Sequence, residues 1–98
     1  MTGDLATGIL TSTTFELPGY TVERTLGMSW GLLVRSVGLT KGLTGGLRAL
    51  KAGMERLVGH AQQLGGNAVL GVRFDSSDIG NGLAEVVAYG TATVVRPA

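Results

Sequence analysis

The sequence contains no cysteine, so one chain can build neither a disulfide framework nor a thiolate metal site. Charged residues make up only 15% of its 98 residues, and there is a single histidine. No stretch reaches the roughly 18 unbroken apolar residues of a membrane-spanning helix. The start, MTGDLATGILTS, also lacks the basic residues and long apolar core of a secretory signal. We therefore expect a cytoplasmic protein without a membrane span.

Aromatic residues are also scarce, at 5% of the chain, and the formal net charge is only +1. A protein that binds single-stranded nucleic acid needs stacking aromatics and a basic surface. The few aromatics here are scattered along the sequence, and the whole chain has no strong positive charge. We therefore expect no nucleic-acid partner.

Hydrophobic residues make up 44% of the chain, which predicts one globular domain rather than a disordered segment. A domain of this size buries a modest fraction of its surface when alone, and without disulfides it needs another source of burial. Self-association is the simplest such source. The sequence therefore predicts a homo-oligomer.

One helix is predicted between about Leu43 and Leu64. Apolar residues recur there at alternating steps of four and three, which places them along one face of a helix. Gly65 and Gly66 follow and predict its end, because glycine readily adopts the left-handed conformation of a C-cap. Before this helix, residues 37–46 are rich in glycine and fit either a loop or a short helical turn. The predicted apolar stripe consists of Leu43, Leu47, Leu50, Met54, Leu57, Ala61 and Leu64.

A long strand is predicted from Tyr20 to Val34, where residue types alternate with period two. About 15 residues at about 3.3 Å each would span roughly 50 Å, more than the width of a small domain. The strand must therefore bend, at Gly27 and Gly31, or reach a neighbouring subunit. Upstream, residues 10–15 could form a short strand, and Leu17-Pro18-Gly19 predicts a turn.

Two more strands are predicted, at residues 67–75 and 83–95, joined by the polar turn DSSDIGNG. The two faces of the last strand are both largely apolar or small. A single helix covers only one face of a sheet, so an apolar second face indicates another cover, most simply a partner subunit.

Basic residues are concentrated in the middle of the chain, where Glu55 is the only acid. They can be read as a solvated helix face or as a site for a small anionic ligand such as a phosphate, next to glycine-rich backbone at residues 38–46. In a ring, symmetry would repeat them as a positive belt. The candidate ligand-binding residues are Arg35, Lys41, Arg48 and Lys51, with Arg56 nearby.

Three other patterns point to chemistry only weakly. The run Gly27-Met28-Ser29-Trp30-Gly31 matches the G-x-S-x-G motif of hydrolases, but it lies within an alternating strand instead of a strand-turn-helix unit. His60 is the only imidazole and falls at the margin of the apolar stripe. Asp75 and Asp78 could hold a hard cation, yet turns use aspartate as well. We therefore predict no catalytic residues, no metal ligands and no cofactor.

The C-terminal half carries a family resemblance. The stretch LGGNAVLGVRFD, followed by a polar turn and EVVAYGTATVV, resembles the signature of the YbjQ family, also called UPF0145 and labelled heavy-metal-binding. Gly66 stands where that family usually has alanine, and Phe74 where it has tyrosine. The resemblance extends over residues 15–95 and implies a small α+β subunit in a ring-shaped homopentamer. It implies no catalytic residues.

Taken together, the sequence predicts an α+β domain with long antiparallel strands and one amphipathic helix packed on the sheet. Residues 1–14 form an N-terminal segment with a possible short strand, and residues 15–96 form the YbjQ-like domain. We expect a non-catalytic homo-oligomer, a pentamer by resemblance, that binds a small ligand or ion. The alternative is a structural assembly or adaptor module without a ligand.

Overall fold

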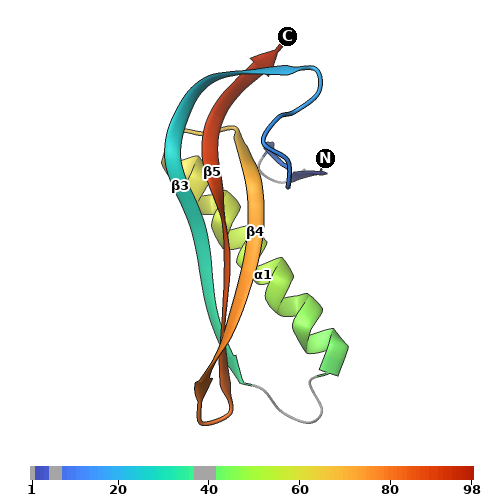
Figure 1. Cartoon of the computed structure of the whole chain (residues 1–98), viewed down its shortest axis with the longest axis vertical. Helices are drawn as coiled ribbons and strands as arrows, with labels where there is room; N and C mark the ends of the chain where they lie inside the picture. The colour runs from blue at the N-terminus through green and yellow to red at the C-terminus, as the bar shows by residue number, and fades with distance from the viewer. Residues whose placement is uncertain (1, 5–7, 37–41) are drawn as a thin grey trace.

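The computed structural model describes residues 2–4, 8–36 and 42–98, which form one helix packed on one mixed sheet (Figure 1). The sheet order is β1-β2-β4-β5-β3, and β2 with β4 is the parallel pair. This confirms the predicted α+β class. The elements are β1 (Thr2–Asp4), β2 (Ile9–Thr11), β3 (Tyr20–Ser36), α1 (Gly42–Gln63), β4 (Ala68–Gly80) and β5 (Leu83–Pro97).

The long strand β3 runs along the long axis of the molecule (Figure 1). The chain measures 48 × 21 × 21 Å, so the strand is longer than the domain is wide but fits along its length without reaching a neighbouring copy. The predicted irregularity at Gly27 is confirmed, since this residue has a φ of 116° and the pairing with β5 shifts between Thr25 and Gly27. Gly31 continues the strand without such a shift.

The hairpin between β4 and β5 is longer than predicted. The segment DSSDIGNG was expected to be a turn, but β4 continues through Gly80, and only Asn81 and Gly82 lie outside the strands. These two residues have φ values of 55° and 71°, which fit the two-residue type I′ turn favoured by Asn-Gly. Polar strand residues near the hairpin tip face solvent, so hydrophobic periodicity does not reveal them.

The N-terminal segment adds β1 and β2 beside β4. The short strand predicted at residues 10–15 occupies Ile9–Thr11, and the following loop is held to β4 by backbone hydrogen bonds from Gly71 to Thr14 and from Val72 to Ser12. The predicted turn at Leu17-Pro18-Gly19 is confirmed, since the Tyr20 amide donates to the Leu17 carbonyl at 3.0 Å.

Helix α1 ends as the two glycines predict. The Gly66 amide donates to the Ala61 carbonyl at 2.9 Å and the Gly65 amide to the Gln62 carbonyl at 3.0 Å, with Gly65 at a φ of 89°. This pair of bonds is the Schellman motif, which satisfies carbonyls at the end of the helix. It also directs the chain straight into β4.

The buried face of α1 differs from the predicted leucine stripe. Leu57 and Ala61 are fully buried as expected, but Leu50 and Leu64 are each 39% exposed. Small residues, Ala49 and Gly53, are buried instead. Leu50 therefore lies at the margin of the side of α1 that packs on the sheet. The side chains of Leu43 and Leu47 lie outside the described part.

The helix meets β3 at a backbone contact between glycines. A Cβ atom on Gly31 would lie 2.6 Å from the Leu57 amide nitrogen and would also overlap the Gly53 carbonyl oxygen. Next to this contact, the buried Ser29 hydroxyl donates to the Leu57 carbonyl at 2.8 Å. Glycine at position 31 therefore allows α1 to approach β3 closely. The hydrogen bond from Ser29 to the Leu57 carbonyl fixes the position of the helix along the strand.

Replacing Gly31 by alanine should reduce the free energy of unfolding by about 1–3 kcal/mol or more, because backbone atoms must move to admit the methyl group. Gly59→Ala is the matched control. A Cβ there has nothing within 4 Å, and alanine should raise the free energy of unfolding by about 0.5–1 kcal/mol because it favours the helix. Urea unfolding of both variants measures the difference. Equal effects of the two substitutions would contradict the contact.

Candidate functional site

The sheet has an apolar face that α1 does not cover. Ser29 and Gly31 point toward the helix, so the alternate residues of β3 point to the opposite side. Apart from the half-buried Val87, the side chains gathered there are exposed. We call this surface the open apolar face; it consists of Met28, Trp30, Leu32 and Val34 from β3 and their cross-strand neighbours Val87 and Tyr89 from β5.

Three large side chains form a row across the open apolar face. Register places Arg73 of β4 opposite Tyr89 of β5, and Tyr89 opposite Trp30 of β3. Phe15 flanks the row, with its ring centre 5.7 Å from the Arg73 guanidinium carbon. Tryptophan, tyrosine and arginine are the residues that most often dominate binding energy in protein interfaces. The sequence could not show this row, because it depends on the register of three strands.

Side chains of α1 form hydrogen bonds with the backbone of β3, which is an edge strand of the sheet. The Trp30 amide donates to His60 Nδ1 at 3.1 Å, and Arg56 donates to the Leu32 carbonyl. The rings of His60 and Trp30 also meet edge to face, with centroids 4.3 Å apart. These contacts orient Trp30 and compete with pairing of another strand at this part of the edge.

The predicted anion-binding residues are spread over two elements. Arg48 and Lys51 are exposed, one turn apart on α1, whereas Arg35 is half-buried on the side of β3 that faces the helix. The Arg35 Nε atom is buried and has no hydrogen-bond partner. Lys41 lies outside the described residues. Within the described ranges, none of Arg35, Arg48 and Lys51 forms an ion pair with an acidic side chain.

The serine of the hydrolase-like motif is a packing residue. Ser29 is fully buried between β3 and α1, and its hydroxyl is used in the bond to the Leu57 carbonyl. The strand continues on both sides of it, without the sharp turn that exposes a nucleophile. The motif match therefore carries no catalytic meaning.

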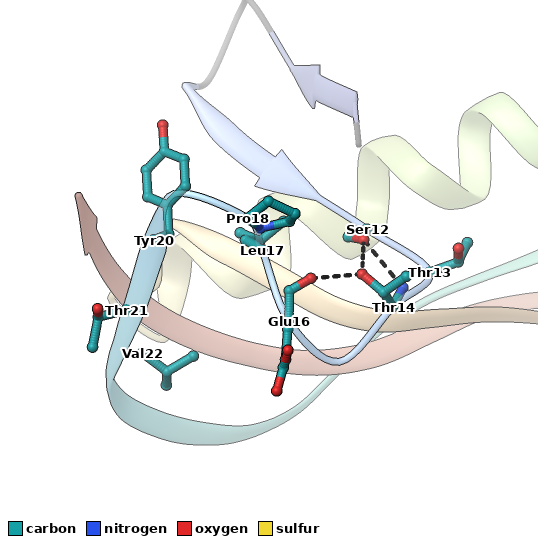
Figure 2. A pocket seen from close by; sticks show the side chains of 9 residues that line it. All are labelled: Ser12, Thr13, Thr14, Glu16, Leu17, Pro18, Tyr20, Thr21 and Val22. Carbon is teal, nitrogen blue, oxygen red and sulfur yellow. Dashed lines mark hydrogen bonds between the residues drawn. The ribbon is translucent and has the colours of Figure 1, made fainter. Parts of the chain in front are cut away.

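A shallow depression of about 780 Å³ lies between the loop at residues 12–18 and the start of β3 (Figure 2). Two of the hydroxyl groups that line it, those of Ser12 and Thr14, form hydrogen bonds within the loop. The Ser12 and Thr14 hydroxyls share a hydrogen bond of 2.6 Å, and Thr14 also donates to the Glu16 carbonyl at 2.6 Å (Figure 2). Glu16 is the only charged residue that lines the depression. These groups stabilise the loop and do not form a reactive cluster.

Comparison with known proteins identifies the family. A family model described as "Putative heavy-metal-binding" matches residues 48–96, within the segment that carries the YbjQ-like signature. A UPF0145 protein of Methanoregula boonei is 46% identical over 91% of this chain and 88% of its own length. The chain belongs to the UPF0145 (YbjQ) family. A UPF0145 protein of Thermoplasma volcanium is 45% identical over 90% of this chain and 85% of its own.

The fold of this UPF0145 chain also matches a crystal structure. A Pediococcus pentosaceus protein of unknown function, from a family named DUF74, superposes with a TM-score of 0.72. It covers 91% of this chain and 99% of the Pediococcus chain, at 17% sequence identity. At this identity the match shows a shared fold. No helix in the described part of the chain is both long and apolar enough to cross a membrane.

The donor groups of this chain do not fit the metal in the family description. The chain has no cysteine, and the His60 Nδ1 atom already accepts the Trp30 amide. Asp75 and Asp78 accept the Ser76 and Gly80 amides at 2.9 and 2.8 Å, as turn and strand-end aspartates often do. Among the described residues, no three His, Cys, Asp or Glu side chains lie together. One subunit therefore lacks the ligand set of a zinc or copper site.

Purified protein should contain less than one zinc or copper ion per assembly, because each subunit offers a single imidazole. Elemental analysis of protein that was never exposed to a nickel column measures this content. His60→Ala is the control variant. One bound transition metal per subunit, lost in His60→Ala, would contradict the prediction.

Proposed function

We propose that the chain is a non-catalytic, cytoplasmic subunit of a homo-oligomeric ring, with five subunits as the family resemblance implies. The open apolar face carries this proposal. It places tryptophan, leucine, valine and tyrosine side chains together on one exposed side of a sheet. Extended apolar patches of this kind mark interaction surfaces, and a subunit of 98 residues gains stability from burying them.

The face, rather than the edge of the sheet, is the proposed contact. His60 and Arg56 engage the Trp30 amide and the Leu32 carbonyl, so a strand added there would have to displace both. The face needs no such rearrangement. Its row of Arg73, Tyr89 and Trp30 supplies large side chains at a central position, as well-packed interfaces require.

A non-catalytic role is supported by the structural hydrogen bonds that the candidate hydroxyl and imidazole groups already form. The Ser29 hydroxyl is buried in the helix contact, and the Ser12 and Thr14 hydroxyls at the depression form hydrogen bonds within their own loop. The His60 Nδ1 atom accepts a backbone amide, so it cannot act there as a general base. The described residues therefore supply no nucleophile paired with a base.

The native particle should have several times the subunit mass of 10.0 kDa in light scattering at micromolar concentration. Leu32→Asp should lower that mass to a single subunit, because assembly would bury an unpaired charge. Leu32 is 45% exposed in the subunit, so the variant should stay folded by circular dichroism. Thr21→Asp, an exposed change on the same strand, is the control and should assemble normally. A wild-type monomer would refute the proposal.

A second candidate function is binding of a small anion by the basic residues. The buried Arg35 Nε atom has no hydrogen-bond partner, and Arg48 and Lys51 are exposed without a salt bridge to another described residue. A ring would repeat these charges around its axis and attract phosphate groups. The structural-module alternative has no such ligand.

Calorimetry with phosphate, nucleotides and polyphosphate tests the second candidate. Binding should weaken as salt rises, because exposed charges are screened. The double variant Arg48→Glu, Lys51→Glu should abolish it, whereas Arg24→Glu, a charge reversal on β3, should leave it unchanged. An absence of heat at low salt would favour the structural module without a ligand.

A further inference from the structure

The chain carries a second exposed apolar surface on α1. Leu50 points in the same helical direction as the buried Leu57, yet it is 39% exposed, and Met54 beside it is half-buried. Ala49 and Gly53 are buried, so Leu50 lies at the margin of the side of α1 that packs on the sheet. We call the described residues 48–54 the α1 overhang. Leu50 extends the core stripe to an exposed position, and Met54 packs in part against the core of its own chain.

We propose that the α1 overhang of one copy covers the open apolar face of the next copy. This inference rests on the proposed self-assembly and names the surface that completes it. Leu50 and Met54 of one subunit would pack against Trp30, Leu32 and Val87 of its neighbour. The face would then be covered by a helix, as the opposite face of the same sheet already is.

The fold supports a helix as the cover. Helix α1 packs its small and apolar residues against one side of β3 and β5, and helices on both faces of a sheet form a common layered architecture. Within one chain, α1 and the open apolar face lie on opposite sides of the sheet. A chain therefore cannot cover its own open face with this helix, and a second copy supplies what each lacks.

The open apolar face carries the cation Arg73 in its central row, and two carboxylates at its border could pair with cations of α1. Register places Asp75 opposite Val87 and Glu85 opposite Val34, so both carboxylates border the open apolar face. The α1 overhang carries Arg48 and Lys51, both exposed. Carboxylates beside these two residues would compete with a bound anion. The proposed contact and the second candidate function thus make opposite demands on Arg48 and Lys51.

A contact between two different surfaces has a consequence for symmetry. The overhang of each copy binds the face of the next, so the interface is heterologous and closes as a ring when the rotation between copies allows it. A contact of the open face with itself would give a two-fold dimer instead. Mixing two variants distinguishes these cases.

The experiment combines Leu32→Asp, which keeps the overhang intact, with Leu50→Asp, which keeps the face intact. Each variant alone should run as a monomer in light scattering, because each lacks one half of the contact. Their equimolar mixture should form a heterodimer of twice the 10.0 kDa subunit mass, because one intact face then meets one intact overhang. Gln62→Asp, an exposed change elsewhere on α1, should assemble as wild type.

The outcomes separate this inference from the proposed function. If Leu50→Asp assembles as wild type while Leu32→Asp is a monomer, the overhang is not the cover, but self-assembly through the face stands. If wild-type protein is itself a monomer, both fail. If Leu50→Asp does not fold, Lys51→Glu replaces it. Lys51→Glu should lower the assembled fraction at least tenfold, and adding Glu85→Lys should restore it; an unchanged assembly in Lys51→Glu would overturn the inference.

Discussion

The backbone contact of Gly31 with Gly53 and Leu57 is the constraint on which the rest of the subunit depends. It brings α1 close enough to β3 for the Ser29 hydroxyl to reach the Leu57 carbonyl. It also decides which residues of β3 face the helix. Because side chains alternate along a strand, the neighbours of Ser29 and Gly31 are placed on the other side of the sheet. The open apolar face is therefore a direct consequence of this one contact.

Periodicity predicts the main helix and the cores of the three long strands, but not β1 or the way in which the elements pack. The alternation of β3 and the two glycines after α1 predict a strand and a helix end close to the observed ones. The leucine stripe of α1 does not predict its buried side correctly, because Ala49 and Gly53 are buried there while Leu50 and Leu64 are exposed. Small residues contribute little to hydrophobic periodicity, yet they mark where backbones approach. The predicted hairpin is also shorter than the observed one, because the polar residues at the end of β4 face solvent and show no hydrophobic periodicity.

The sequence predicts that the sheet has a second apolar face, but it does not predict which residues meet on that face. An apolar second face follows from the sequence of β5, and the structure bears this out in the exposed side chains of β3. The row of Arg73, Tyr89 and Trp30 requires a register that the Asn81-Gly82 turn and the bulges determine together. The basic residues are a different case. Arg35 lies on β3 and Arg48 on α1, so their relative placement depends on how the helix packs on the sheet and not on their separation in the sequence.

A zinc or copper site in this protein would need more than one copy of the chain. One chain offers a single imidazole and no thiol, so the ligand groups would have to come from several copies. His60 packs against Trp30, and Trp30 lies in the open apolar face. Covering that face would change the surroundings of both residues at once. Because Trp30 is the only tryptophan, its fluorescence reports on the open apolar face and on the contact with His60.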